Sequence, residues 1–177
     1  GDILAINNKF GLTGVGFDIL LHRDMNVKDF SKYRGAINSV LEPNDLGNEA
    51  YILADNRLAT ASIDSSDGLS KTLKDLALSN PNLGFEIDFN DNLIHEKATE
   101  YSKEFSVSLE KLVFEGGEEF IHLFAIDPRD FDKAQQLVKS KGGRLFKVGK
   151  AISGEKIYFL KKSKRFELKN QGYEHFK

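Results

Sequence analysis

The sequence contains no cysteine and no tryptophan, and only one methionine and three prolines among its 177 residues. Without cysteine there is no disulfide, no thiolate zinc site and no cysteine nucleophile, and this is consistent with a reducing cytoplasm. No apolar run approaches the roughly 18 residues that a membrane-spanning helix needs. Residues 1–10 lack the basic and then apolar pattern of a signal peptide. We therefore expect a cytoplasmic protein with no membrane partner.

Excess positive charge is also missing, since the formal net charge is -2. Proteins that bind nucleic acid usually carry a basic stripe, so no nucleic-acid partner is expected. The one dense basic cluster is Lys161, Lys162, Lys164 and Arg165. It is typical of an exposed strand end, and a contact to phosphate is the alternative.

What is present is the composition of an ordinary globular domain, with 40% hydrophobic and 29% charged residues. A chain of this length can bury a core as one domain, residues 1–177. Alternating apolar patterns predict strands at 3–6, 59–63, 85–89, 120–126, 145–150 and 156–160. Spacings of three and four residues predict helices at 27–40, 45–56, 69–78, 93–105 and 129–141.

This order predicts an α+β fold, a two-layer α/β arrangement with a mixed sheet and helices packed on one face. The last two strands flank Gly154, which suggests a hairpin between them. Gly11, Gly14 and Gly16 follow the first strand without forming the pattern GxGxxG. Close packing of a helix is the better interpretation of these glycines.

The first segment that could carry chemistry joins the strand at 59–63 to the helix at 69–78. It reads Asp64-Ser65-Ser66-Asp67-Gly68. Two carboxylates and two hydroxyls suit Mg²⁺, which binds oxygen ligands and bridges to phosphates. The start of the helix offers free N–H groups to an anion. The alternative is structural, with Ser66 or Asp67 capping the helix and Asp64 bracing the turn.

Two further segments are candidates. Glu115-Gly116-Gly117-Glu118-Glu119 combines a flexible backbone with three acids that would repel one another unless a cation or a donor-rich ligand lies nearby. The alternative is an exposed acidic loop. Near the end of the sequence, Tyr173, His175 and Phe176 could stack on a heteroaromatic ring, or the segment could dock its aromatic side chains into the core.

Together these three segments resemble thiamine-monophosphate kinases in order and approximate spacing. The resemblance rests on Asp64-Ser65-Ser66-Asp67-Gly68-Leu69, Gly116-Gly117-Glu118-Glu119 and Gly172-Tyr173-Glu174-His175-Phe176, with support from the opening residues and from Val148-Gly149-Lys150-Ala151. Two departures stand out: Glu119 replaces the aspartate that is usual in the family, and Ser65 replaces an apolar residue. The first two motifs are shared with the wider aminoimidazole ribonucleotide synthetase superfamily, and the last points to the kinase.

The resemblance implies an aminoimidazole ribonucleotide synthetase-like C-terminal domain whose ATP-binding partner domain precedes it in the intact protein. It implies transfer of the γ-phosphoryl group of ATP to thiamine monophosphate, with ATP as co-substrate and Mg²⁺ as cofactor. In that assignment Asp64 and Asp67 bind the metal and Ser66 contacts ATP phosphate, while Glu118 or Glu119 contacts the substrate and Tyr173 packs on its ring. The intact protein would be a homodimer through the preceding domain, and these 177 residues alone would be inactive.

Two other functions remain open at this point. One is a related ATP-dependent synthetase or paralogue of the same superfamily that acts on another phosphorylated or carboxylated substrate. The other is a non-catalytic module that binds a phosphorylated ligand. The sequence start, which has no initiator methionine and begins inside a predicted strand, leads us to expect a boundary made by truncation or cleavage.

Overall fold

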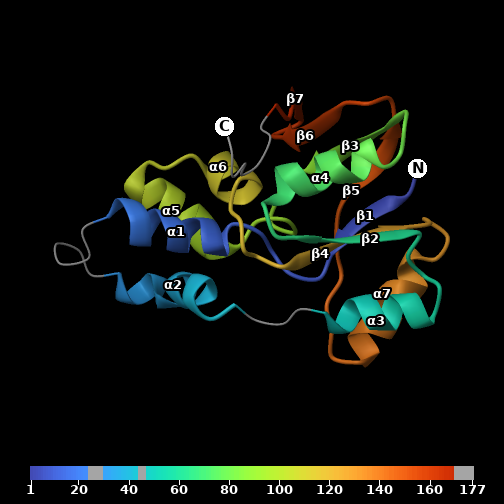
Figure 1. Ribbon diagram of the computed structural model, residues 1–177, viewed down its shortest axis with the longest axis horizontal. Helices are drawn as coiled ribbons and strands as arrows, with labels where there is room; N and C mark the ends of the chain where they lie inside the picture. The colour runs from blue at the N-terminus through green and yellow to red at the C-terminus, as the bar shows by residue number, and fades with distance from the viewer. Residues whose placement is uncertain (24–29, 44–46, 170–177) are drawn as a thin grey trace.

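Seven strands form one mixed sheet in the computed structural model (Figure 1), which describes residues 1–23, 30–43 and 47–169. The strands of this described part are β1 (Ile3–Ile6), β2 (Ala61–Ser65), β3 (Leu83–Asp88), β4 (Ile121–Ile126), β5 (Phe146–Ser153), β6 (Ile157–Lys161) and β7 (Lys164–Glu167). Six of them lie at the predicted places, and β7 was not predicted. The α+β class and the mixed sheet are confirmed.

The described helices are α1 (Leu12–His22), α2 (Arg34–Leu41) after a short 3₁₀ turn at Ser31–Tyr33, α3 (Asn48–Asp55), α4 (Leu69–Leu78), α5 (Glu96–Phe105), α6 (Leu109–Phe114) and α7 (Phe131–Ser140). The predicted bounds of α4 are confirmed at both ends. α1 and α6 were not predicted. None of the helices in the described ranges is long and apolar enough to span a bilayer.

The sheet order is β2-β4-β1-β5-β3-β6-β7, and only β3 and β6 pair in parallel. The predicted hairpin between β5 and β6 is therefore wrong, because β3 lies between them. The connection between β5 and β6 passes over the start of β3, where Gly84 allows it: a Cβ on Gly84 would lie 2.2 Å from the carbonyl oxygen of Lys156. β6 instead forms a hairpin with β7, and the basic cluster at 161–165 is its exposed turn, as the strand-end interpretation predicted.

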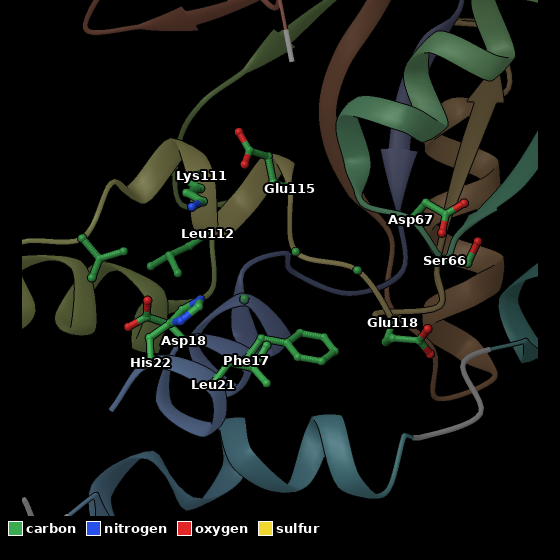
Figure 2. A pocket seen from close by; sticks show the side chains of 14 residues that line it. Phe17, Asp18, Leu21, His22, Ser66, Asp67, Lys111, Leu112, Glu115 and Glu118 are labelled. Carbon is green, nitrogen blue, oxygen red and sulfur yellow. The ribbon is translucent and has the colours of Figure 1, made fainter. Parts of the chain in front are cut away.

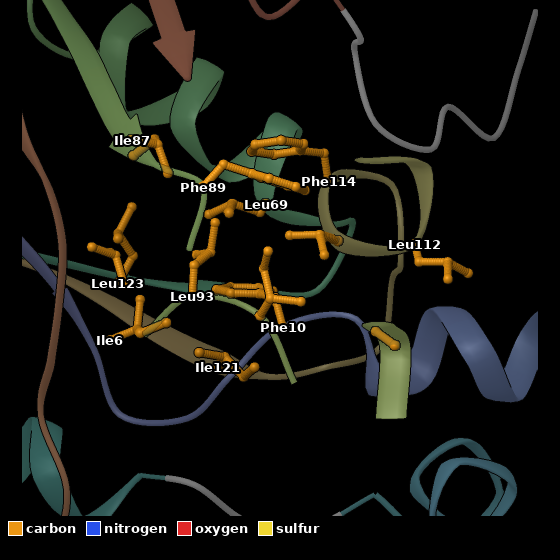
Figure 3. Close-up of a cluster of buried hydrophobic side chains, with 14 of the residues drawn as sticks. Ile6, Phe10, Leu69, Ile87, Phe89, Leu93, Leu112, Phe114, Ile121 and Leu123 are labelled. Atoms are coloured by element: carbon orange, nitrogen blue, oxygen red, sulfur yellow. The ribbon is translucent and has the colours of Figure 1, made fainter. Parts of the chain in front are cut away.

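Helices cover both faces of the sheet, which corrects the prediction that they pack on one face. α1, α2, α4, α5 and α6 bury the larger core on one face (Figure 3), whereas α3 and α7 bury a second cluster on the other. The reason lies in the central strands, which are apolar on both sides. Leu4 and Ile6 of β1 face the larger core and Ala5 faces the smaller one.

α1 packs closely against neighbouring helices at its glycines, as the glycine pattern predicted. A Cβ on Gly16 would lie 2.2 Å from the carbonyl oxygen of Ala36 in α2, and a Cβ on Gly14 would lie 2.5 Å from that of Leu112 in α6. Backbones can approach this closely only where no side chain intervenes. The same glycines are the reason that α1 was not predicted from the sequence, because glycine disfavours helix interiors.

Candidate functional site

Two of the predicted segments lie together at one end of the β2–β4 pair. β2 ends where β4 begins, with Ser65 opposite Ile121, so the connections that follow β2 and precede β4 are neighbours. Their backbones are joined by hydrogen bonds from Glu118 N to Ser66 O at 2.7 Å and from Phe120 N to Ser65 O at 2.9 Å. The antiparallel register therefore assembles what the sequence separates by about fifty residues.

Glycines make this contact close. A Cβ on Gly117 would lie 3.1 Å from Ser66 O, and a Cβ on Gly68 would lie 2.9 Å from Phe114 O. Gly68 also has φ of 93°, which other residues rarely adopt. Glycine at these positions therefore serves backbone-to-backbone packing of the two loops.

A pocket of about 490 Å³ opens beside these loops (Figure 2). It is lined by α1 residues Gly14, Phe17, Asp18, Leu21 and His22, by Ser66 and Asp67, and by Val107, Lys111, Leu112, Glu115, Gly116, Gly117 and Glu118. Figure 2 shows Ser66, Asp67 and Glu118 toward one end, and Asp18 and His22 toward the other. The pocket therefore has two polar ends separated by apolar side chains.

The predicted site residues divide into those that line this pocket and those that do not. Ser66, Asp67 and Glu118 line it. Asp64 and Glu119 are not among the lining residues. Tyr173 lies outside the residues that the structure describes.

Glu119 points into the protein and holds the beginning of α1. Its Oε1 accepts hydrogen bonds from Gly11 N at 2.8 Å, from Thr13 N at 3.2 Å and from Thr13 Oγ1 at 3.0 Å. Oε2 is buried and has no partner within the described residues. Burial raises the pKa of Glu119 to about 8 and outweighs the N–H donors, which lower it. Glu119 therefore anchors α1, and its raised pKa favours the neutral carboxyl.

The conformation of this loop decides which glutamate faces the pocket. Glu118 and Phe120 both have positive φ, 58° and 49°, in the left-handed region that costs energy for residues other than glycine. Together they turn the backbone so that Glu119 is buried between the exposed Glu118 and the partly buried Phe120. Glu118 is left exposed at the pocket.

Asp64 lies on the other face of the sheet. It is directly opposite His122 in the β2–β4 register, and directly opposite residues project to the same side. The His122 ring in turn stacks on Phe124, which belongs to the smaller core under α3 and α7. Asp64 thus projects to that face and does not line the pocket, and its predicted metal role stays a prediction.

α4 begins shortly after the pocket-lining residues Ser66 and Asp67, although none of its own residues lines the pocket. Its N-cap is Gly68, and no side chain caps it. The alternative that Ser66 or Asp67 serves as the cap therefore does not apply in this structure. Uncapped N–H groups at a helix start favour anions, and here the Ser66 hydroxyl and the Asp67 carboxylate lie next to them.

Sequence reasoning missed the wall that α1 contributes. The α1 residues that line the pocket are at positions 14, 17, 18, 21 and 22, which recur at helical spacing along one face. This spacing could have predicted the helix, but the glycines argued against one. Asp18 on this wall accepts hydrogen bonds from Tyr101 Oη at 2.7 Å and from Arg23 Nε at 3.0 Å. Burial and the bond to Asp18 raise the pKa of Tyr101, which therefore stays protonated as a donor.

No protein-family model matches the chain. A curated protein from Nitrosopumilus maritimus, "Thiamine-monophosphate kinase", is 29% identical over 99% of this chain. This chain resembles thiamine-monophosphate kinases. The resemblance read from its motifs is thereby confirmed. The chain spans about half the length of the curated kinase, 54%.

Two solved structures show the same fold. AaThiL, complexed with AMPPCP and TMP, matches with a TM-score of 0.76 at 21% identity, over 99% of this chain and 52% of that one. HypE of E. coli, a hydrogenase maturation protein, matches with a TM-score of 0.67 at 14% identity, over 95% of this chain and 49% of that one. The predicted fold, like that of aminoimidazole ribonucleotide synthetase, is thus confirmed.

The side chains at the pocket's loop end suit a cation that is shared with a phosphate, but do not enclose one. Within the described ranges, no group of three or more histidine and acidic side chains is arranged to hold a metal. Mg²⁺ commonly takes only one or two carboxylates and completes its shell with water and phosphate oxygens. Asp67 can supply such a carboxylate at this end.

Proposed function

We propose that this chain is the C-terminal half of a kinase that transfers the γ-phosphoryl group of ATP to thiamine monophosphate, giving thiamine diphosphate. The observation that carries the proposal is the alignment to the curated kinase, which runs over 99% of the chain. The pocket supports it, because Ser66, Asp67 and Glu118 line one cavity.

The loop end of the pocket would receive phosphate. The first N–H groups of α4 and the Ser66 hydroxyl are donors to phosphate oxygens. Asp67 would hold Mg²⁺, which when bound would neutralise negative charge on the phosphates. Glu118 would contact thiamine monophosphate from the opposite loop. The α1 and α6 walls, with Phe17, Leu21 and Leu112, would hold the apolar part of the substrate.

Phosphoryl transfer needs no covalent enzyme intermediate in this assignment. Catalysis of this type depends on alignment of acceptor and donor and on neutralised charge. The buried Glu119 contributes by fixing the loop that presents Glu118 relative to α1. It is therefore assigned to positioning, while the substrate contact is assigned to Glu118.

The other half of the curated kinase's length would supply the remaining ATP and metal ligands. We further propose that the intact protein is a cytoplasmic homodimer formed through that half, and that this chain alone does not turn over. The family resemblance supports both points.

The test is product formation by the intact protein with Mg²⁺, ATP and thiamine monophosphate. We expect ADP release that depends on thiamine monophosphate, together with thiamine diphosphate in the product mixture. Formylglycinamidine ribonucleotide serves as the control substrate for a related synthetase. ATP consumption with that control, and none with thiamine monophosphate, would overturn the kinase assignment in favour of the synthetase. Binding of thiamine monophosphate without turnover by the intact protein would favour a non-catalytic module.

A further inference from the structure

Asp18 is a fixed acceptor at the end of the pocket away from the phosphate loops. Tyr101 Oη donates to its Oδ2 at 2.7 Å, Arg23 Nε donates to the same oxygen at 3.0 Å, and Arg23 Nη2 lies 3.0 Å from it. Tyr101 is fully buried in α5 and rests against Phe105, so this brace is rigid. Two donors thereby hold Oδ2 of Asp18 in place.

The brace uses one carboxylate oxygen and leaves the other available. Among the described residues, all hydrogen bonds of Asp18 end on Oδ2. Asp18 itself lines the pocket. Its Oδ1 therefore keeps its full acceptor capacity for a ligand, because a carboxylate oxygen can accept two hydrogen bonds.

The wall that α1 forms between the phosphate loops and Asp18 is apolar. On α1, Gly14 lies against the Gly-Gly loop, and Asp18 lies one helical turn further, about 6 Å along the axis. Phe17 and Leu21 lie on the same wall and Leu112 faces them from α6, as Figure 2 shows. Leu21 is 68% exposed, a large apolar surface for which no partner is found within the described residues.

A ligand that matches this pocket has an anion at one end, a flat ring in the middle that can pack on Phe17, Leu21 and Leu112, and a hydrogen-bond donor at the other end. Thiamine monophosphate has that order: a phosphate, a thiazolium ring and an aminopyrimidine ring that carries an amino group. Lys111, which also lines the pocket, can only donate and cannot accept a hydrogen bond from an amino group, whereas Asp18 is a carboxylate acceptor at the same end as His22. Glu118 lies near the phosphate loops.

We propose that Asp18 is the residue that selects the substrate's ring, by accepting a hydrogen bond from the ring amino group on Oδ1. This inference rests on the proposed function and deepens it. It assigns Asp18 to substrate recognition, and Tyr101 and Arg23 to positioning of that acceptor. Asp18 in this assignment is in addition a structural link between α1 and α5, so the experiment must separate the two roles.

The experiment compares two substrates on the intact protein. One is thiamine monophosphate and the other is its oxo analogue, in which an oxo group replaces the ring amino group and so presents an acceptor in place of a donor. The wild-type KM for the amino substrate is expected to be about ten- to hundredfold lower than the KM for the oxo analogue. This is the difference that one hydrogen bond to a charged group would make. Equal KM values for the two substrates in the wild-type protein would overturn the proposal without any variant.

The variant Asp18→Asn tests the residue. Its amide oxygen can take the place of Oδ2 toward Tyr101 and Arg23, which directs the amide NH₂ into the pocket. We expect the preference to reverse, with a higher KM for the amino substrate and a lower one for the oxo analogue, while kcat changes little. Equal changes for both substrates would indicate a structural role only and would overturn the proposal.

Two further variants serve as controls. Tyr101→Phe removes one donor to Oδ2 but leaves the Asp18 carboxylate, so the preference for the amino substrate is expected to persist. Asp55→Asn makes the same chemical change at an exposed position of α3, on the other face of the sheet, and is expected to leave both KM values unchanged. A wild-type protein that makes no thiamine diphosphate contradicts the proposed function itself. An active wild type with an unchanged preference in Asp18→Asn contradicts only this inference.

Discussion

Glu119 and Thr13, 106 residues apart in the sequence, are joined by two hydrogen bonds that end on one carboxylate oxygen. Thr13 Oγ1 also lies 2.7 Å from Gly117 O, so its single hydroxyl hydrogen is shared between the glutamate and the Gly-Gly loop, and one side chain bridges the two. Through these contacts the start of α1, which forms one wall of the pocket, is fixed to the loop that forms its end. The geometry of the pocket therefore depends on a buried residue outside its lining.

Replacing Glu119 by alanine should lower the free energy of unfolding by roughly 2–5 kcal/mol, because the N–H groups of Gly11 and Thr13 lose their buried acceptor. Glu119→Gln keeps an oxygen acceptor and should lose less than about 1.5 kcal/mol. Denaturant titration of the purified variants measures both. A glutamine variant as unstable as the alanine variant would indicate that a charged carboxylate is required.

The same residue predicts how stability depends on pH. Burial raises the pKa of Glu119 to about 8, above the value near 4.3 of an unfolded chain, so the folded state binds the proton more tightly. The stabilisation is complete below about pH 4.3 and is lost progressively as the pH rises toward 8. Unfolding free energies at several pH values between 5 and 9 should therefore fall more steeply in the wild type than in Glu119→Gln. Parallel curves for the two proteins would contradict the raised pKa.

The glycines of the first two helices predict opposite effects of one substitution. Gly16→Ala places a Cβ 2.2 Å from the carbonyl oxygen of Ala36 and should destabilise the protein by more than about 2 kcal/mol. Gly35→Ala in α2 meets nothing within 4 Å and should stabilise it by up to about 1 kcal/mol. Thermal unfolding of the two variants should move in opposite directions from the wild type. A Gly16→Ala protein of wild-type stability would contradict the close approach of α1 and α2.

Asp64 at the end of β2 and Asp67 in the loop after it should differ in their effect on catalysis. Asp67 lines the pocket and Asp64 projects to the other face of the sheet. In the intact protein, Asp67→Asn is therefore expected to reduce turnover by more than about tenfold and to raise the Mg²⁺ concentration needed for half-maximal rate. Asp64→Asn should change both by less than about threefold, since it removes no pocket ligand. Titration of the rate with Mg²⁺ checks both, and a larger loss in the Asp64 variant would reverse the assignment.

Local patterns in the sequence were enough to predict most elements of the fold. The apolar spacing of the helix at 69–78 predicted α4 with its observed bounds, because one face of that helix is buried along its length. The strand pattern of 120–126 was equally clear, and β4 covers 121–126. The pairing of β3 with both β5 and β6 was not predictable, because it joins segments far apart in the chain and the turn at Gly154 equally favours a hairpin.

The sequence by itself determined which segments are candidates for the site. Residues 64–67 combine hydroxyls with carboxylates, and residues 115–119 combine glycines with acids, and both combinations suit binding of a cation or a phosphate. Only the tertiary structure decided which side chains face the pocket. Glu118 faces outward and Glu119 inward because two residues adopt positive φ, a cost that the bonds to α1 offset. Asp64 and Asp67 part because Asp64 lies within β2, where the register with β4 fixes its face, whereas Asp67 follows the strand in the turn that leads to α4. α1 forms a wall of the pocket because Gly16 and Gly14 let its backbone approach α2 and α6 closely.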